Sequence, residues 1–129
     1  MKNYLFFAFI LCSNFLFSQD FVGYYYKEIS GKKGEIFEYS LQLNEDFTYS
    51  IEFKRKLNQL NSETEIFTGN GNWKQEKHKI FFYPKPCECE KEINLLGVTS
   101  RFKSKDSTEL VFFNFKENWT LNVGMKKQI

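Results

Sequence analysis

Two cysteines separated by a single residue carry the most distinctive chemistry of this chain. Cys87 and Cys89 alternate with Glu88 and Glu90 after a proline-rich turn. A disulfide between residues two apart is strained, and strain makes such a bond easier to reduce. Two thiolates also suit Cu(I) or Zn²⁺, although a tetrahedral zinc site needs further ligands. The neighbouring carboxylates disfavour the thiolate, which argues against redox catalysis. The open predictions are a local or intermolecular disulfide, a soft-metal site, or inert thiols.

The other reactive side chains show no catalytic pattern. His78 is the only histidine, and it stands between lysines at a predicted turn, which favours an exposed residue over a ligand or a base. The chain has no G-x-S-x-G elbow, no H-E-x-x-H motif and no phosphate-binding glycine loop. Most carboxylates alternate outward on predicted strands. We therefore expect a protein that is not an enzyme and that uses no cofactor.

Aromatic residues supply the second candidate site. They make up 19% of the chain, including 16 phenylalanines and 7 tyrosines. In a small barrel, large aromatic side chains fill the interior unless a cavity is left, and tyrosine hydroxyls would orient a ligand in such a cavity. The candidate ligand-binding residues are Tyr24, Tyr26, Tyr39, Tyr49, Phe53 and Trp73.

The elements that must position these residues are strands, because apolar and polar residues alternate after residue 20 and no helical period is sustained. The predicted strands cover residues 21–29, 35–43, 47–53, 65–75, 79–83, 92–96, 98–103, 108–115 and 119–125. Turn formers separate them roughly every ten residues. The pattern predicts an all-β, antiparallel meander of eight or nine short strands that closes as a small barrel or flattened sandwich, since closure removes sheet edges.

Three local features refine this pattern. Gly69 and Gly71 interrupt a strand, which indicates a bulge or a close backbone approach. Residues 108–115 carry apolar side chains at both parities, which predicts a strand covered on both faces. The tail over residues 126–129 is expected to fray.

Three segments resemble the first strands of small lipocalin-like β-barrel domains. The matching segments are Phe21–Tyr25, Leu41–Tyr49 (similar to L-x-L-x-x-D-G-T-F) and Gly71–Trp73 with Lys79-Ile80. The resemblance covers residues 21–83 and implies an antiparallel barrel, a fold that often binds small apolar molecules. Phe47 stands where the family has glycine. A turn with φ > 0 would strain a phenylalanine, so we predict a different turn there.

The N-terminus predicts export. Residues 1–18 combine a basic residue near the start, an apolar run over residues 4–11 and the small residue Ser18 at the end, as in a secretory signal peptide. The apolar run is short for a transmembrane helix, and Cys12 lacks the small preceding residue of a lipidation site. We expect a single domain over residues 19–129, in the periplasm or outside the cell, with no transmembrane helix in the mature chain.

The net charge of the chain limits the kinds of partner it can bind. The formal net charge is +2, and it falls to about +1 without the signal peptide, which argues against a nucleic-acid surface. We expect non-enzymatic binding of a small apolar or amphipathic ligand in the cell envelope. The alternatives are a module that binds another envelope protein, and copper or zinc binding through Cys87 and Cys89. The sequence leaves the oligomeric state open.

Overall fold

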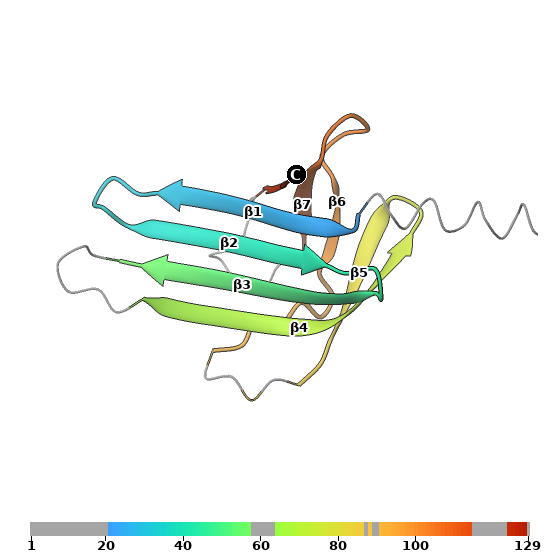
Figure 1. Cartoon of the computed structure of the whole chain (residues 1–129), viewed down its shortest axis with the longest axis horizontal. Helices are drawn as coiled ribbons and strands as arrows, with labels where there is room; N and C mark the ends of the chain where they lie inside the picture. The colour runs from blue at the N-terminus through green and yellow to red at the C-terminus, as the bar shows by residue number, and fades with distance from the viewer. Residues whose placement is uncertain (1–20, 58–63, 87, 89–90, 115–123, 129) are drawn as a thin grey trace, which may run out of the picture.

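Eight antiparallel strands form a closed barrel in the order of the chain (Figure 1). The computed structural model describes residues 21–57, 64–86, 88, 91–114 and 124–128. The strands are β1 (Gly23–Ser30), β2 (Ile36–Leu43), β3 (Thr48–Lys56), β4 (Glu65–Glu76), β5 (Lys79–Pro84), β6 (Thr99–Phe102), β7 (Glu109–Phe113) and β8 (Met125–Lys127). The all-β meander predicted from alternation is confirmed. The predicted signal peptide lies outside the described residues.

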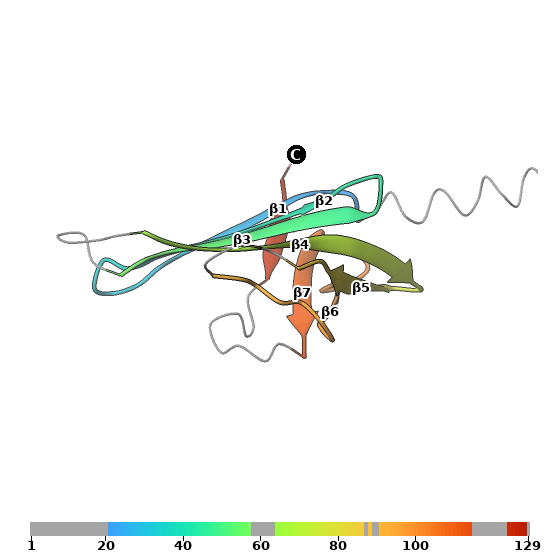
Figure 2. The same ribbon diagram turned by 90° about the horizontal axis from the view of Figure 1, so that it is seen from below.

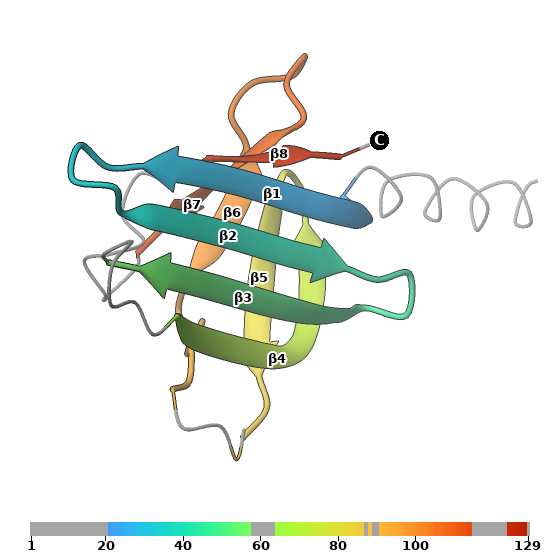
Figure 3. The same ribbon diagram turned by 60° about the vertical axis from the view of Figure 1, so that its left-hand side comes forward.

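The barrel is flattened into two layers. The long strands β1 to β4 run side by side in one layer, and β5, β6 and β7 lie across them in the other (Figures 2 and 3). β4 curves from the first layer into the second, where it pairs with β5 (Figure 3). No helix in the described part of the chain has the length and apolar character needed to cross a bilayer.

Two glycines allow other backbone to approach the middle of β4. A Cβ atom at Gly69 would collide with the carbonyl oxygen of Ile93, and one at Gly71 would collide with that of Tyr83. The predicted close approach is therefore confirmed. Any larger residue would force the neighbouring strand or segment away.

The segment after β5 contributes side chains to the core but is not a strand, so the strand predicted over residues 92–96 is wrong. Thr68 of β4 donates its N–H to the Lys91 carbonyl (3.1 Å) and accepts from the Ile93 N–H (2.8 Å). This makes one isolated parallel bridge, between Thr68 and Glu92. Ile93 and Leu95 are buried. Their alternation therefore reflects core filling without a continuous ladder.

β7 is buried on one face only, which corrects the prediction of a strand covered on both sides. Leu110 and Phe112 are buried, whereas Phe113 is 38% exposed. The guanidinium of Arg101 lies 5.0 Å from the Phe113 ring centroid. A closed barrel has a single interior. The apolar side chains on the outer face of β7 are therefore shielded by surface contacts such as this one.

The C-terminal segment closes the barrel, so the frayed tail predicted there is wrong for residues 126–128. Lys126 and Lys127 pair with Tyr26 and Tyr25 of β1. The N–H of Gln128 donates to the Tyr24 carbonyl at 2.7 Å. The preceding residues 115–123, which hold most of the last predicted strand, lie outside the described part.

The turn between β2 and β3 keeps a left-handed residue despite the phenylalanine there. Phe47 has φ 64°, its N–H donates to the Asn44 carbonyl (3.1 Å), and the Asn44 N–H donates to the Thr48 carbonyl (2.9 Å). This is a three-residue hairpin loop whose last position normally takes glycine. The prediction of a different turn is wrong because the Phe47 ring packs on Trp73, with ring centroids 5.0 Å apart.

Candidate ligand site at the charged end of the barrel

Cross-strand register arranges the inner face of β1 to β4 into rows. Two adjacent rows lie toward the β1–β2 and β3–β4 connections: Lys27, Tyr39, Phe53 and Phe67 form one, and Ile29, Phe37, Arg55 and Glu65 form the other. We call these eight residues, together with Lys91, the charged end. It combines an aromatic surface with four charged side chains.

The aromatic rings of the charged end form a connected group. The Phe53 ring centroid lies 4.6 Å from that of Tyr39, 5.6 Å from that of Phe67 and 6.2 Å from that of Phe37. Phe53 and Tyr39 are buried, whereas Phe37 and Phe67 are half-buried and Ile29 is 37% exposed. The deep rings therefore fill the core, and the outer apolar side chains face the end of the barrel.

Two cations converge on one carboxylate oxygen beside these rings. The Arg55 Nη2 atom donates to Glu65 Oε2 at 2.9 Å, and Lys91 Nζ donates to the same oxygen at 2.7 Å. The Arg55 guanidinium and the Lys91 ammonium also lie 5.6 and 5.3 Å from the Phe67 ring centroid. All three charged side chains are partly shielded, with 29–40% of their surface exposed.

The charges of this cluster do not balance. The hydrogen bonds from Lys91 and Arg55 hold the pKa of Glu65 below its ordinary value, so one negative charge faces two positive charges at neutral pH. The buried Arg55 Nε–H has no hydrogen-bond partner within the described residues. An unpaired N–H of this kind can donate to an anionic group.

The six predicted ligand-binding residues do not form one site. Tyr39 and Phe53 belong to the charged end. Tyr24 and Tyr26 point outward, and Tyr24 is 42% exposed, so neither lines the interior of the barrel. Ligand binding by these two residues stays a prediction. The inward residue is Tyr25, which is buried and donates its hydroxyl to the Phe21 carbonyl at 2.7 Å. Because three tyrosines follow one another here, the alternation of residue types does not show which of them faces the interior.

Trp73 lies at the other end of the barrel, which we call the closed end. Its indole N–H donates to the Asn44 carbonyl (3.2 Å) and its backbone N–H to the Phe47 carbonyl (2.8 Å). Both donors are therefore used in holding the β2–β3 turn. Trp73 acts as a structural plug, and no donor of its side chain is left for a ligand.

Tyr49 lies between the two ends, deep in the core. It is 2% exposed, its ring meets Phe82 edge-on at 5.1 Å, and its hydroxyl has no partner among the described residues. Burial, and secondarily the charge of Glu92, raises the pKa of Tyr49 to about 12. The Tyr49 hydroxyl is therefore a polar group buried among apolar side chains.

The predicted disulfide or metal residues cannot be placed relative to the charged end. Cys87 and Cys89 lie outside the described residues, so their disulfide and metal predictions stay open. His78 is exposed in the loop between β4 and β5. Within the described ranges, no three His, Cys, Asp or Glu side chains are grouped as metal ligands.

Sequence reasoning missed the residues that define the charged end. Arg55 was visible only as the middle of a basic run, and Lys91 lies 26 residues from Glu65. One signal was available: Arg55 shares the parity of Tyr49, Ile51 and Phe53, so the inner face of β3 ends in a cation. Comparison with protein-family models, with curated proteins and with solved structures found no match.

Proposed function

We propose that this protein binds an anionic amphiphile at the charged end of the barrel, as an exported, non-enzymatic binding protein of the lipocalin-like type. The head group would lie at Arg55 and Lys91. The apolar chain would pack on Ile29, Phe37 and Phe67. The observation that carries the proposal is the convergence of two cations on a single carboxylate oxygen beside a partly exposed aromatic surface.

The chemistry of the cluster favours an anion over a cation. Arginine has five N–H donors and lysine has three, and Glu65 takes one from each. A carboxylate, sulfate or phosphate head group could accept hydrogen bonds from the remaining N–H groups of Arg55 and Lys91 without displacing Glu65. Hydrogen bonds to charged groups contribute about 1.5–3 kcal/mol, more than those between neutral groups.

The position of the cluster also supports the proposal. Ligand sites in barrels are common at the mouth, where apolar walls meet a few polar groups. The eight-strand closed barrel is the architecture that the lipocalin-like resemblance implies. In an eight-strand barrel, the core is mostly filled by side chains, so a ligand would bind near one end.

The test compares two amphiphiles with the same chain and opposite head charge. Dodecanoate and dodecyltrimethylammonium are titrated below their micelle concentrations into residues 19–129, and binding is followed by calorimetry. We expect dodecanoate to bind more tightly. Arg55→Gln and Lys91→Gln should each weaken dodecanoate binding by about tenfold, the factor that corresponds to 1.4 kcal/mol.

Lys74→Gln is the matched control, because Lys74 pairs with Glu76 at 3.7 Å on the exposed face of β4. It removes the same charge away from the charged end and should leave binding unchanged. Equal affinity for the two amphiphiles would contradict the proposal. So would a lower melting temperature of Arg55→Gln with unchanged dodecanoate affinity, because the cluster would then only tie residue 91 to β4.

A further inference from the structure

The outer face of β1 to β4 carries a second, chemically different surface. Its side chains alternate with those of the core, and register again sets them in rows. One row is Tyr24, Gln42, Ser50 and Asn70, and the next is Tyr26, Ser40, Glu52 and Thr68. We call these eight residues the outer platform. Each row begins with a tyrosine on β1 and continues through polar residues.

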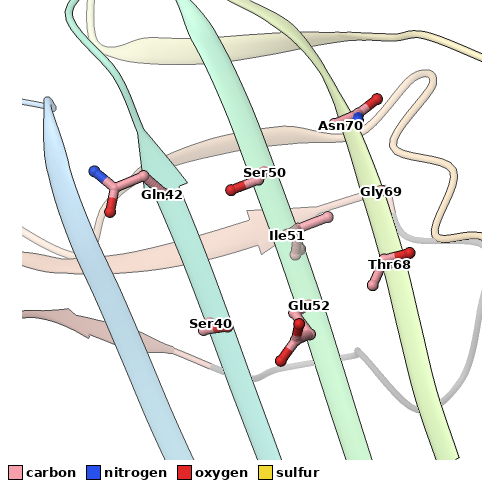
Figure 4. A pocket seen from close by; sticks show the side chains of 8 residues that line it. All are labelled: Ser40, Gln42, Ser50, Ile51, Glu52, Thr68, Gly69 and Asn70. Atoms are coloured by element: carbon pink, nitrogen blue, oxygen red, sulfur yellow. The ribbon is translucent and has the colours of Figure 1, made fainter.

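A hollow of about 230 Å³ lies over β2, β3 and β4 within the outer platform (Figure 4). Its polar lining comes from all three strands: Ser40, Gln42, Ser50, Glu52, Thr68 and Asn70. Four adjacent strands span three inter-strand distances, about 14 Å. The platform is therefore long enough for a short run of linked pyranose rings.

Five of these polar side chains are neutral and keep their hydrogen-bonding capacity. Those of Ser40, Gln42, Ser50, Thr68 and Asn70 make no hydrogen bond with any group in the described part of the chain. Hydroxyl and amide groups offer both donors and acceptors. The one charged group, Glu52, is paired with Lys54 at 3.3 Å.

The two tyrosines add an aromatic surface beside the hollow. The Tyr24 and Tyr26 rings lie 6.5 Å apart with an interplanar angle of 22°, and Tyr24 is 42% exposed. The face of an aromatic ring is electron-rich and attracts groups with partial positive charge. The C–H face of a pyranose ring fits such a surface, while its hydroxyls need mixed donors and acceptors.

We infer that the outer platform binds an uncharged oligosaccharide, with one sugar ring on Tyr24 and its neighbours hydrogen-bonded across β2 to β4. An anionic glycan would meet Glu52 and the adjacent pair of Glu28 and Glu38, which lie opposite each other in the next row. A purely apolar ligand would leave the amides and hydroxyls of the hollow unpaired. A neutral, hydroxyl-rich ligand avoids both costs.

The experiment uses ¹⁵N-labelled protein over residues 19–129 and neutral hexasaccharides of glucose and of N-acetylglucosamine, with α- and β-linkages represented. Amide chemical shifts are followed to about 10 mM sugar, so that binding as weak as about 1 mM, which corresponds to about −4.1 kcal/mol, is detected. We expect at least one sugar to move amides of β1 to β4 around the outer platform.

Two variants at opposite ends of one row sharpen the test. Tyr24→Ala should weaken binding about tenfold, and Asn70→Ala severalfold. Phe113→Ala is the control, because Phe113 is a comparably exposed aromatic residue on β7. It should bind like the unaltered protein. Amide dispersion of each variant shows that it folds.

Three results would overturn the inference. The first is that no hexasaccharide moves the platform amides. The second is that Tyr24→Ala and Asn70→Ala bind as the unaltered protein does. The third is that the platform shifts depend on protein concentration alone, which would assign the face to a second copy of the chain. Dodecanoate should instead shift the amide signals of the charged end. The two proposed sites can therefore be confirmed or refuted independently.

Discussion

The two ends of the barrel use aromatic residues in opposite ways. At the closed end, Trp73 donates its side-chain N–H to the Asn44 carbonyl and packs its ring against Phe47. At the charged end, Arg55 and Lys91 share one oxygen of Glu65, and the Arg55 Nε–H has no partner among the described residues. The paired N–H donors of Trp73 stabilise the fold at the closed end. An end with unpaired donors beside half-buried rings has the means to bind.

The inner and outer faces of β1 to β4 also differ in the kind of side chain they carry. Along the middle of each strand, the inner parity is mostly buried and apolar, and the outer parity presents mainly polar side chains and the two tyrosines of β1. The outer groups add little to the core. Their hydrogen-bonding groups are the basis of the proposed sugar site.

The largest effect is expected when the closed end is opened. Trp73→Ala should lower the free energy of unfolding by about 3–5 kcal/mol, as for other large core truncations, and it also removes the bond to Asn44. Trp73→Phe should cost less because most of the ring volume stays. Urea unfolding of both variants checks this, and a loss below about 1 kcal/mol for Trp73→Ala would show that the end is not a structural plug.

A smaller effect is expected from the polar group between the ends. Tyr49→Phe removes a buried hydroxyl without a partner, so we expect it to be neutral or to stabilise the fold by about 1 kcal/mol. The raised pKa of Tyr49, about 12, adds a pH signature. The unfolded chain ionises this group near pH 10, so the folded state loses stability as the pH rises from about 10 to 12.

Melting temperatures between pH 8 and 12 measure that signature, and about 10 is the ordinary tyrosine value. Tyr49→Phe should lose less stability than the unaltered protein over the upper part of this range. Tyr83→Phe, at a 52% exposed position, should follow the unaltered protein. If Tyr49→Phe instead costs well over 1 kcal/mol, the hydroxyl has a partner such as an internal water.

A near-cancellation is expected at Phe47. Its left-handed backbone costs about 1–2 kcal/mol for a residue other than glycine, and its ring gains about 0.5–1.5 kcal/mol on Trp73. Phe47→Gly should therefore change stability by less than about 1 kcal/mol. Phe47→Ala keeps the strain but loses the ring, and should be the less stable variant. The opposite order in urea unfolding would mean that glycine relieves no backbone strain at this position.

The smallest effect is expected from the carboxylate of the charged end. Glu65 has a lowered pKa, so its contribution is present above the ordinary glutamate value, about 4.3. It is lost as the pH falls further through the lowered pKa. Glu65→Gln should flatten the decline in melting temperature between pH 5 and 3, roughly the range that brackets this value. Glu76→Gln, on the exposed part of β4, serves as the control and should decline with the unaltered protein.

Alternation was enough to predict most of the barrel and little of its candidate sites. It located β2, β3 and β5 closely because each has one buried parity. It failed in the run Tyr24–Tyr26, where every residue is apolar enough to be inward, and over residues 92–96, where buried side chains have no ladder. It could not find the cluster at Glu65, because that cluster depends on strand register and on a residue from a distant segment.

The closure of the barrel between β1 and β8 has a consequence for the order of folding. β1 to β7 can form through pairing between neighbours in the chain. Among the described residues, the other edge of β1 pairs with β8, a short strand far along the chain. Closing a long loop is entropically slow, so this seam should be the last to form. Until it does, the newly made sheet exposes an edge that other chains can pair with. Chaperone protection of the nascent chain would matter most during that interval.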